Sequence, residues 1–181
     1  MSSVVTTPLR VVLTGSESTG KSSLAHDLAA RYDAELTPEY SREYALAHHN
    51  VLGPDDVDPI AQGQIALEDE HVEAARSRGG RLVVQDTDLL STLVYASHYY
   101  DVSPPWIVDA ARARRPDLYL LLETDVPWVP DAVRDRGHER EAIQQMFRDA
   151  VRASGVPFVA ITGDWTARRE QAIAAIDRLL G

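Results

Sequence analysis

The 181-residue sequence contains no cysteine, which excludes disulfide bonds and thiolate-bound metals. It has no apolar run of membrane-spanning length, and its first residues, MSSVVTTP, lack the basic and apolar segments of a signal peptide. The formal net charge is −10, so there is no basic surplus to displace counterions from DNA or RNA. We therefore expect a soluble, cytoplasmic protein that binds neither nucleic acid nor membranes.

Lysine is almost as rare as cysteine. Of the 18 lysine and arginine residues, only Lys21 is a lysine. It completes the pattern G-x-x-x-x-G-K-[ST] with Gly15, Gly20 and Ser22, which is the phosphate-binding P-loop pattern. A slender ammonium fits beneath a triphosphate, where the broad planar guanidinium would not fit in the same way. The pattern therefore predicts a nucleoside triphosphate site, rather than a glycine-rich turn with a solvated lysine.

The sequence around this pattern has the order that a P-loop requires. Residues 9–13 are a short apolar run typical of a buried strand, and residues 21–32 carry apolar positions at helical spacing. Glycines let the backbone turn tightly towards phosphate oxygens, and the new helix adds its positive end. Lys21 would contact the β- and γ-phosphates of ATP, and the Ser22 hydroxyl would bind Mg²⁺. The ATP-binding residues that we predict are Gly15, Glu17, Ser18, Thr19, Gly20, Lys21, Ser22, Ser23 and Arg140.

Apolar strand segments alternate with helical segments along the rest of the chain. This alternation predicts an α/β P-loop NTPase fold, in which helices cover both faces of a five-stranded parallel sheet. We expect one kinase domain over residues 1–181, with a loose leader at 1–8 and a short arginine-bearing lid at 124–140. Further strands are expected at 34–37, 81–86, 117–122 and 157–161, a loop at 50–59, and helices at 41–49, 59–77, 87–100, 104–114, 139–154 and 166–180.

Three carboxylates follow predicted strands, at the sheet edge where such folds bind ligands. Asp86 ends the strand expected beside the P-loop strand, where it can hold Mg²⁺ opposite Ser22. Asp88 can bind substrate hydroxyls, or it or Thr87 can cap the next helix. Glu39 lies across the predicted cleft, where it can accept a proton from an acceptor hydroxyl or position that hydroxyl. The predicted metal ligands are Ser22 and Asp86, and the predicted catalytic residues are Lys21, Glu39, Asp86, Arg134 and Arg136.

The segment 127–140 is a polar, proline-broken loop after the fourth predicted strand. Arg134, Arg136 and Arg140 lie in or beside it and can reach a transferring phosphate when such a loop closes. Alternatively, the loop is exposed and its arginines pair with its own acidic residues. Trp128 can stack on a flat aromatic ligand, and so can tyrosines, for which core packing is the alternative. The predicted substrate-binding residues are Glu39, Tyr40, Arg42, Asp88, Tyr95 and Trp128.

Five segments, in this order, resemble the ribosylnicotinamide kinase domain of NAD-salvage regulators, in the P-loop kinase superfamily: GSESTGKSSL, PEYSREY, DVDPIAQGQ, VVQDTDLLST and LYLLLETDVPWVPDAVR. The resemblance implies a nucleoside-kinase-like fold and phosphorylation of the ribose 5′-hydroxyl of nicotinamide riboside by ATP and Mg²⁺. It also implies that Trp128 and neighbouring aromatics hold the nicotinamide ring, while Glu39, Asp86 and Asp88 face ribose and metal. The H-x-G-H pattern of nucleotidyltransferases is absent, so adenylyl transfer is not expected.

Two other functions remain open at this point. The same chemistry could serve another nucleoside, a nucleotide or a small metabolite, although a monophosphate acceptor would require more cations than Arg42 alone. A nucleotide-dependent switch is disfavoured, because the chain has no N-K-x-D segment and no D-x-x-G element after the third predicted strand. The expected partners are ATP and a nucleoside, and a homo-oligomer is left open.

Overall fold

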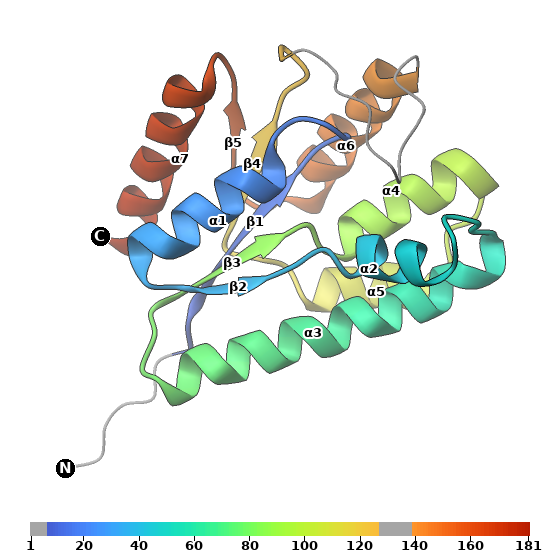
Figure 1. Cartoon of the computed structure of the whole chain (residues 1–181), viewed down its shortest axis with the longest axis horizontal. Helices are drawn as coiled ribbons and strands as arrows, with labels where there is room; N and C mark the ends of the chain where they lie inside the picture. The colour runs from blue at the N-terminus through green and yellow to red at the C-terminus, as the bar shows by residue number, and fades with distance from the viewer. Residues whose placement is uncertain (1–6, 127–138) are drawn as a thin grey trace.

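The described part of the computed structural model, residues 7–126 and 139–181, is built on one parallel sheet (Figure 1). Its strand order is β2-β3-β1-β4-β5, and every neighbouring pair is parallel. This confirms the predicted five-stranded α/β architecture. The strands are β1 (Leu9–Thr14), β2 (Glu35–Thr37), β3 (Leu82–Asp86), β4 (Leu118–Leu122) and β5 (Phe158–Ile161).

The central strands are largely apolar because helices cover both faces of the sheet. In β1, Val11 and Leu13 belong to the core on one face and Val12 to the core on the other, and all three are fully buried. In β4, Leu120 and Tyr119 alternate in the same way. Strands buried on both faces appear in the sequence as continuous apolar runs, which made their positions predictable.

Helices α1 and α7 pack on one face of the sheet, and α4 and α6 pack on the other. Helix α3 runs beside β2 and β3 and also contacts α2 and α4 (Figure 1). None of the helices in the described ranges is long and apolar enough to cross a membrane. The helices are α1 (Lys21–Tyr32), α2 (Tyr40–Ala47), α3 (Val57–Ser77), α4 (Leu89–Tyr100), α5 (Pro105–Ala113), α6 (Arg140–Ser154) and α7 (Trp165–Leu180).

Two helix starts differ from the prediction by two residues, and the other starts differ by one residue at most. Helix α3 begins at Val57, before the expected Pro59, because a 3₁₀ turn at Pro54–Asp56 leads directly into it. Proline is tolerated there, since the first N–H groups of a helix have no intrahelical partner. Helix α4 begins at Leu89 rather than at residue 87, because Asp88 occupies the N-cap position.

The buried strands make a stability prediction. Leu120 is fully buried in β4, whereas Leu46 on α2 is 55% exposed. Leu120→Ala should lower the free energy of unfolding by about 2–5 kcal/mol, because it leaves a cavity in a packed core. Leu46→Ala, the matched control, should change it by less than about 1 kcal/mol. Urea denaturation measures both, and equal losses would contradict the layered core described above.

Candidate functional site

The P-loop connects β1 to α1 and is held in shape by a second helix. Gly15 has a φ of +127°, and a Cβ there would lie 2.6 Å from the main-chain oxygen of Leu122. Gln144 of α6 is fully buried beside it: its Oε1 accepts from the Ser16 N–H at 2.8 Å, and its Nε2 donates to the Leu122 oxygen at 3.0 Å. The close approach of the loop to β4 therefore requires glycine, and one glutamine fixes both segments.

Lys21 lies inside the loop that it was predicted to serve. Its side chain is buried, and its Nζ donates to the Ser16 carbonyl at 2.6 Å. The Thr19 hydroxyl donates to the same carbonyl at 3.0 Å. Because the N-cap residue of α1 is Gly20, no capping side chain covers the first N–H groups of this helix. The loop thus combines a lysine ammonium with a helix N-terminus, which is the usual means of binding phosphate.

The structure brings together Ser22 and Asp86, the two residues predicted to hold a metal. The Ser22 hydroxyl donates to Oδ2 of Asp86 at 2.5 Å. This follows from the sheet, since β1 and β3 are neighbours and Leu13 is in register with Asp86. A hydroxyl and a carboxylate are hard oxygen ligands of the kind that Mg²⁺ accepts alongside water and phosphate oxygens. The residues present therefore fit the predicted ion.

Glu39 lies at the N-cap position of α2, and its carboxylate is buried but does not cap the helix. Its Oε1 accepts from the Ser41 hydroxyl at 3.2 Å, and its Oε2 is 3.7 Å from Nε of Arg42. The predicted base is thus a buried carboxylate beside a half-exposed arginine. Its role in proton transfer stays a prediction.

Asp88 has the capping role that the sequence left as an alternative. Its Oδ1 accepts from the Leu90 N–H at 3.1 Å, and its Oδ2 accepts from the Tyr119 hydroxyl at 2.6 Å. Burial is the main cause that raises the pKa of Asp88, partly offset by the hydrogen bond from Tyr119. Both carboxylate oxygens therefore have structural partners, and the contact with substrate hydroxyls stays a prediction.

A cavity of about 460 Å³ opens between α2, α3 and α4. Arg42 alone carries a charge among the described residues that line it. Thr87 lines it with a φ of +70°, which is unusual for a β-branched residue and typical of functional sites. Its aromatic wall consists of Tyr95, Tyr99 and Tyr100. Its polar wall consists of Ser41, Arg42, Asn50, Gln64, Thr87, Ser91 and Thr92.

Of the two tyrosines predicted to bind substrate, Tyr95 lines this cavity and Tyr40 does not. Tyr95 lines it and also packs in the core, stacked on Tyr99 at 5.9 Å and edge-on to Phe147 at 5.5 Å. Tyr40 is not among the described lining residues, and its ring packs against α3 at Gly63. Tyr95 thus combines the two predicted alternatives, because it lines the cavity and also packs in the core. Tyr40 makes packing contacts.

Arg140, at the start of α6, reaches the P-loop as expected of an ATP-binding residue. It donates to the Ser18 carbonyl at 3.1 Å and to the Val126 carbonyl at 2.9 Å. Burial lowers its pKa, while the charge of Glu17 acts in the opposite direction. Glu17 is 1% exposed, and within the described ranges neither of its carboxylate oxygens has a hydrogen-bond partner. A buried positive and a buried negative charge therefore face each other at this end of the loop.

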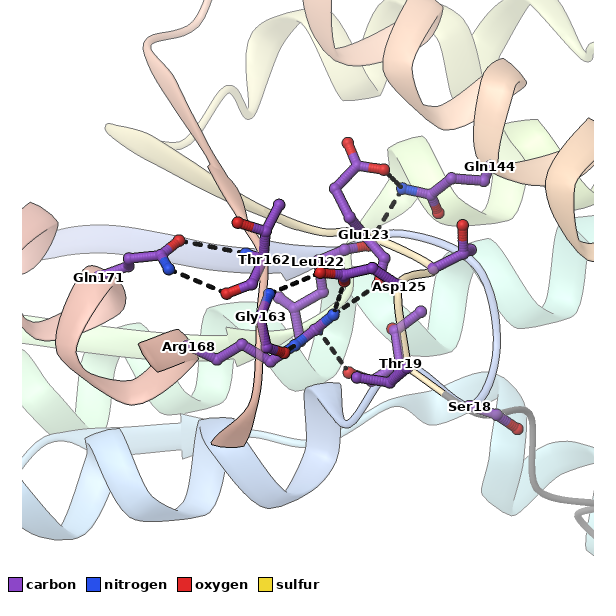
Figure 2. A network of polar contacts seen from close by, with 12 residues as sticks. Ser18, Thr19, Leu122, Glu123, Asp125, Gln144, Thr162, Gly163, Arg168 and Gln171 are labelled. Atoms are coloured by element: carbon purple, nitrogen blue, oxygen red, sulfur yellow. Dashed lines mark hydrogen bonds and ion pairs between the residues drawn. The ribbon is translucent and has the colours of Figure 1, made fainter. Parts of the chain in front are cut away.

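A second buried arginine, Arg168 of α7, joins three segments (Figure 2). It donates to the carbonyls of Thr19 at 3.1 Å, Glu123 at 2.9 Å and Gly163 at 2.8 Å, and it pairs with the Asp125 carboxylate. These contacts tie the P-loop to the segments that follow β4 and β5. The sequence does not indicate this role, because Arg168 and Arg169 are adjacent on a polar helix and nothing in that pattern distinguishes a buried arginine from an exposed one.

Comparison with known proteins identifies the fold family. A family model described as an AAA domain matches residues 10–168, which include the P-loop, Glu39, Asp86 and the lining of the cavity. The chain belongs to this AAA domain family. Its P-loop, sheet order and covering helices are thus the features of a nucleotide-binding fold.

Individual proteins and solved structures are similar to this AAA domain in sequence or in fold. It is 28% identical to the trifunctional NAD biosynthesis/regulator protein NadR of Salmonella typhimurium (strain LT2), over 94% of this chain and 42% of the relative. Crystal structures of NadR protein are similar to it: the complex with NR has a TM-score of 0.80 and 24% identity over 95% of this chain and 50% of that chain. The complex with NAD and AMP-PNP has a TM-score of 0.73 and 25% identity over 95% and 49%. Thymidylate kinase from Ehrlichia chaffeensis shares the fold, with a TM-score of 0.70 and 14% identity over 96% and 100%.

These comparisons confirm the resemblance to the NAD-salvage regulators and a kinase-like P-loop fold. The AAA domain spans half or less of the length of the NadR proteins that it matches. Three predicted site residues, Trp128, Arg134 and Arg136, lie outside the described residues, as does most of the predicted lid. Ser23 is exposed on the first turn of α1. The roles of these four residues stay predictions.

A buried polar cluster that contacts the cavity-lining Gln64 corresponds to no motif in the sequence. Glu68 of α3 is 1% exposed and pairs with Arg10 at 3.3 Å and Arg114 at 3.2 Å. Burial and the nearby Asp88 charge raise the pKa of Glu68 to about 7, although both arginines act against this rise. The indication in the sequence was that Glu68 lies at helical spacing from Gln64 and Ile60, on the inner face of α3.

The raised pKa of Glu68 predicts a pH dependence of stability. An acid with a higher pKa in the folded state stabilises the fold below its ordinary pKa, and this contribution is lost as pH rises to about 7. The free energy of unfolding of the wild type, relative to Glu68→Gln, should therefore fall between pH 4.5 and 7.5, by at most about 3 kcal/mol. The exposed Glu70→Gln is the control and should show no such difference. Urea denaturation across this range measures the effect, and a relative rise in wild-type stability would contradict it.

Proposed function

We propose that this AAA domain is an ATP-dependent kinase that phosphorylates the ribose 5′-hydroxyl of nicotinamide riboside to give nicotinamide mononucleotide. One observation carries the proposal: the cavity extends to Thr87, the residue after the carboxylate that contacts the P-loop. Thr87 lines the cavity and directly follows Asp86, whose carboxylate meets Ser22 of the P-loop. An acceptor in the cavity would therefore lie next to the end of a triphosphate bound by the loop.

The lining of the cavity supports a nucleoside as the acceptor. Its volume is within the range of pockets that hold small ligands. Hydroxyl and amide side chains suit ribose hydroxyls, and the three tyrosines offer flat surfaces to a heteroaromatic ring. Arg42 is the single charge among the described lining residues, which favours a nucleoside over a nucleotide acceptor. The names of the relatives, with NAD biosynthesis in one and NR in another, agree with this proposal.

In the proposed reaction, the acceptor oxygen attacks the γ-phosphorus of ATP in line with the departing ADP. The new bond joins the ribose 5′-oxygen to phosphorus, and the bond from phosphorus to the β–γ bridging oxygen breaks. Glu39, which contacts the cavity-lining Ser41 and Arg42, accepts the hydroxyl proton or positions that hydroxyl. Lys21 and Arg140 offset the negative charge of the phosphates. Arg134 and Arg136 are proposed to add to this from the lid, and Trp128 to contact the ring of the acceptor.

Ser22 and Asp86 would hold Mg²⁺ in this site. When bound, the ion neutralises charge on the β- and γ-phosphates. The two residues are already in contact, so the chain supplies preorganised oxygen ligands. The support from relatives for ATP as the donor is the NadR structure with AMP-PNP.

The acceptor panel is the direct test of this proposal. The purified chain is incubated with Mg·ATP and, in separate reactions, nicotinamide riboside, other nucleosides and nucleoside monophosphates such as dTMP, and ADP release is measured. We expect kcat/KM to be highest for nicotinamide riboside, because the cavity has an aromatic wall and few charges. A preference for a monophosphate would overturn the proposed acceptor while keeping the kinase chemistry. Absence of ADP release with every acceptor would overturn the enzyme itself.

Lys21 gives a sharper test of the mechanism. Lys21→Ala should lower kcat by about 100- to 1,000-fold, because the buried ammonium that offsets phosphate charge is lost. Lys21→Arg should not restore activity, since the guanidinium is too broad for the loop. Arg31→Ala, on the exposed last turn of the same helix, is the control and should retain activity. Near-normal turnover by Lys21→Ala would remove the P-loop from the mechanism.

A further inference from the structure

The N-terminus of α2 is capped by a side chain from another helix. The first N–H groups of a helix have no intrahelical partner, and the N-cap residue Glu39 makes no side-chain cap. Instead, Oε1 of Gln64 on α3 accepts from the Tyr40 N–H at 3.1 Å. Gln64 is 2% exposed, so the side chain that accepts this hydrogen bond is buried. The start of α2, and with it the backbone of Glu39, is therefore attached to α3.

The ring of Tyr40 is held by the neighbouring residue of α3. A Cβ at Gly63 would lie 2.0 Å from Cε1 of Tyr40, so the ring occupies the place of a side chain. Any other residue at position 63 would displace this ring. We call Gly63 and Gln64 the Tyr40 seat, because together they fix the ring and the N–H group of one residue. Figure 1 shows α2 beside α3, where this contact forms.

The amide of Gln64 is itself oriented by a chain of buried partners. Its Nε2 donates to Oε1 of Glu68 at 3.3 Å, one turn further along α3. Oε2 of Glu68 accepts from Arg10 of β1 at 3.3 Å and from Arg114 after α5 at 3.2 Å. With its nitrogen committed to Glu68, the amide presents its oxygen to Tyr40. The seat is thus connected to the central strand of the sheet.

We propose that Gln64, oriented by Glu68, is a positioning residue that sets the carboxylate of Glu39 against the acceptor hydroxyl. The inference rests on the proposed kinase function, because it assigns to Glu39 the proton-accepting or hydroxyl-positioning role. Glu39 precedes Tyr40 directly, and its carboxylate is placed by the first turn of α2, where Ser41 and Arg42 also contact it. A shift of this turn would move Glu39 together with the cavity-lining Ser41 and Arg42.

The proposal predicts a particular kinetic pattern. Misplacing a catalytic group by about 1 Å can cost about 100-fold in rate, without loss of substrate binding. Loss of the seat should therefore lower kcat and leave KM for ATP within about 3-fold, because Gln64 makes no contact with the P-loop in the described structure. Gln64 also lines the cavity, so a direct contact with the acceptor would instead raise the KM for that acceptor.

Two glutamines on α3 provide the matched comparison. Gln64→Met removes both hydrogen bonds at similar side-chain length, whereas Gln62→Met makes the same change on the exposed face. Gln64→Met should lower kcat about 10- to 100-fold, and Gln62→Met should be close to the wild type. Glu68→Gln, outside the cavity lining, should show a smaller loss of the same kind, with Glu70→Gln as its exposed control. Equal kcat for Gln64→Met and Gln62→Met, or a change confined to the KM of the acceptor, overturns the proposal.

Gly63 gives an independent test through a double-mutant cycle. Gly63→Ala should lower kcat because the new Cβ displaces the Tyr40 ring, although alanine favours a helix more than glycine does. In a Tyr40→Ala background the same change should have little further effect, because the ring is absent. Additive effects of the two changes overturn the proposed seat.

Amide exchange of Tyr40, followed by NMR, needs no substrate and separates this inference from the proposed function. Exchange should accelerate in Gln64→Met and stay unchanged in Gln62→Met, provided that far-UV circular dichroism shows both variants folded.

If Gln64→Met does not fold, Glu68→Gln takes its place. If the wild type phosphorylates a different acceptor, kcat is measured with that acceptor. If it phosphorylates no acceptor, the proposed function fails, and the amide exchange rate of Tyr40 then tests the Tyr40 seat without any measurement of activity. Unchanged exchange in Gln64→Met overturns the seat in every case.

Discussion

The register between β1 and β3 determines where the chemistry of this molecule can take place. Leu13 is opposite Asp86, so the P-loop leaves one strand at the point where the carboxylate ends the next. The 2.5 Å contact between Ser22 and Asp86 is a consequence of that register. Because parallel strands end at the same edge, a one-residue slip would turn Asp86 to the other face and separate the pair. The candidate site therefore depends on this register.

Buried polar side chains then shape the site, and Gln144, Arg168 and Glu68 each have several hydrogen-bond partners. Gln144 of α6 contacts the P-loop and β4, Arg168 of α7 contacts the P-loop and the segment after β4, and Glu68 binds two arginines. An unpaired polar group in such positions would cost several kcal/mol, so the arrangement holds only when every partner is in place. This makes the site geometrically specific, and the raised pKa of Glu68 shows that burial of the charge is not fully compensated.

The sequence predicted what local patterns encode. Strands buried on both faces appear in the sequence as apolar runs, and helices appear as apolar residues at helical spacing between residues that begin or end a helix. The P-loop pattern located Lys21 and Ser22. It could not predict contacts between side chains far apart in the chain, such as Gln144 with Ser16, 128 residues away. For Asp88 the same position serves a helix cap or a ligand, and only its contacts with Leu90 and Tyr119 show the cap.

The two halves of the proposed reaction are supported by different parts of the fold. The nucleotide side is fixed by α6 and α7 through Gln144 and Arg168, and the acceptor side by α3 through Gln64. Gln64 and Gln144 have the same chemistry, since each uses its amide oxygen to accept a main-chain N–H and its nitrogen to hold a second group. Because these supports share no residue among the described contacts, the acceptor wall can vary without disturbing the P-loop. Such a separation allows one fold to carry different acceptor sites, because function depends on the site rather than on the fold.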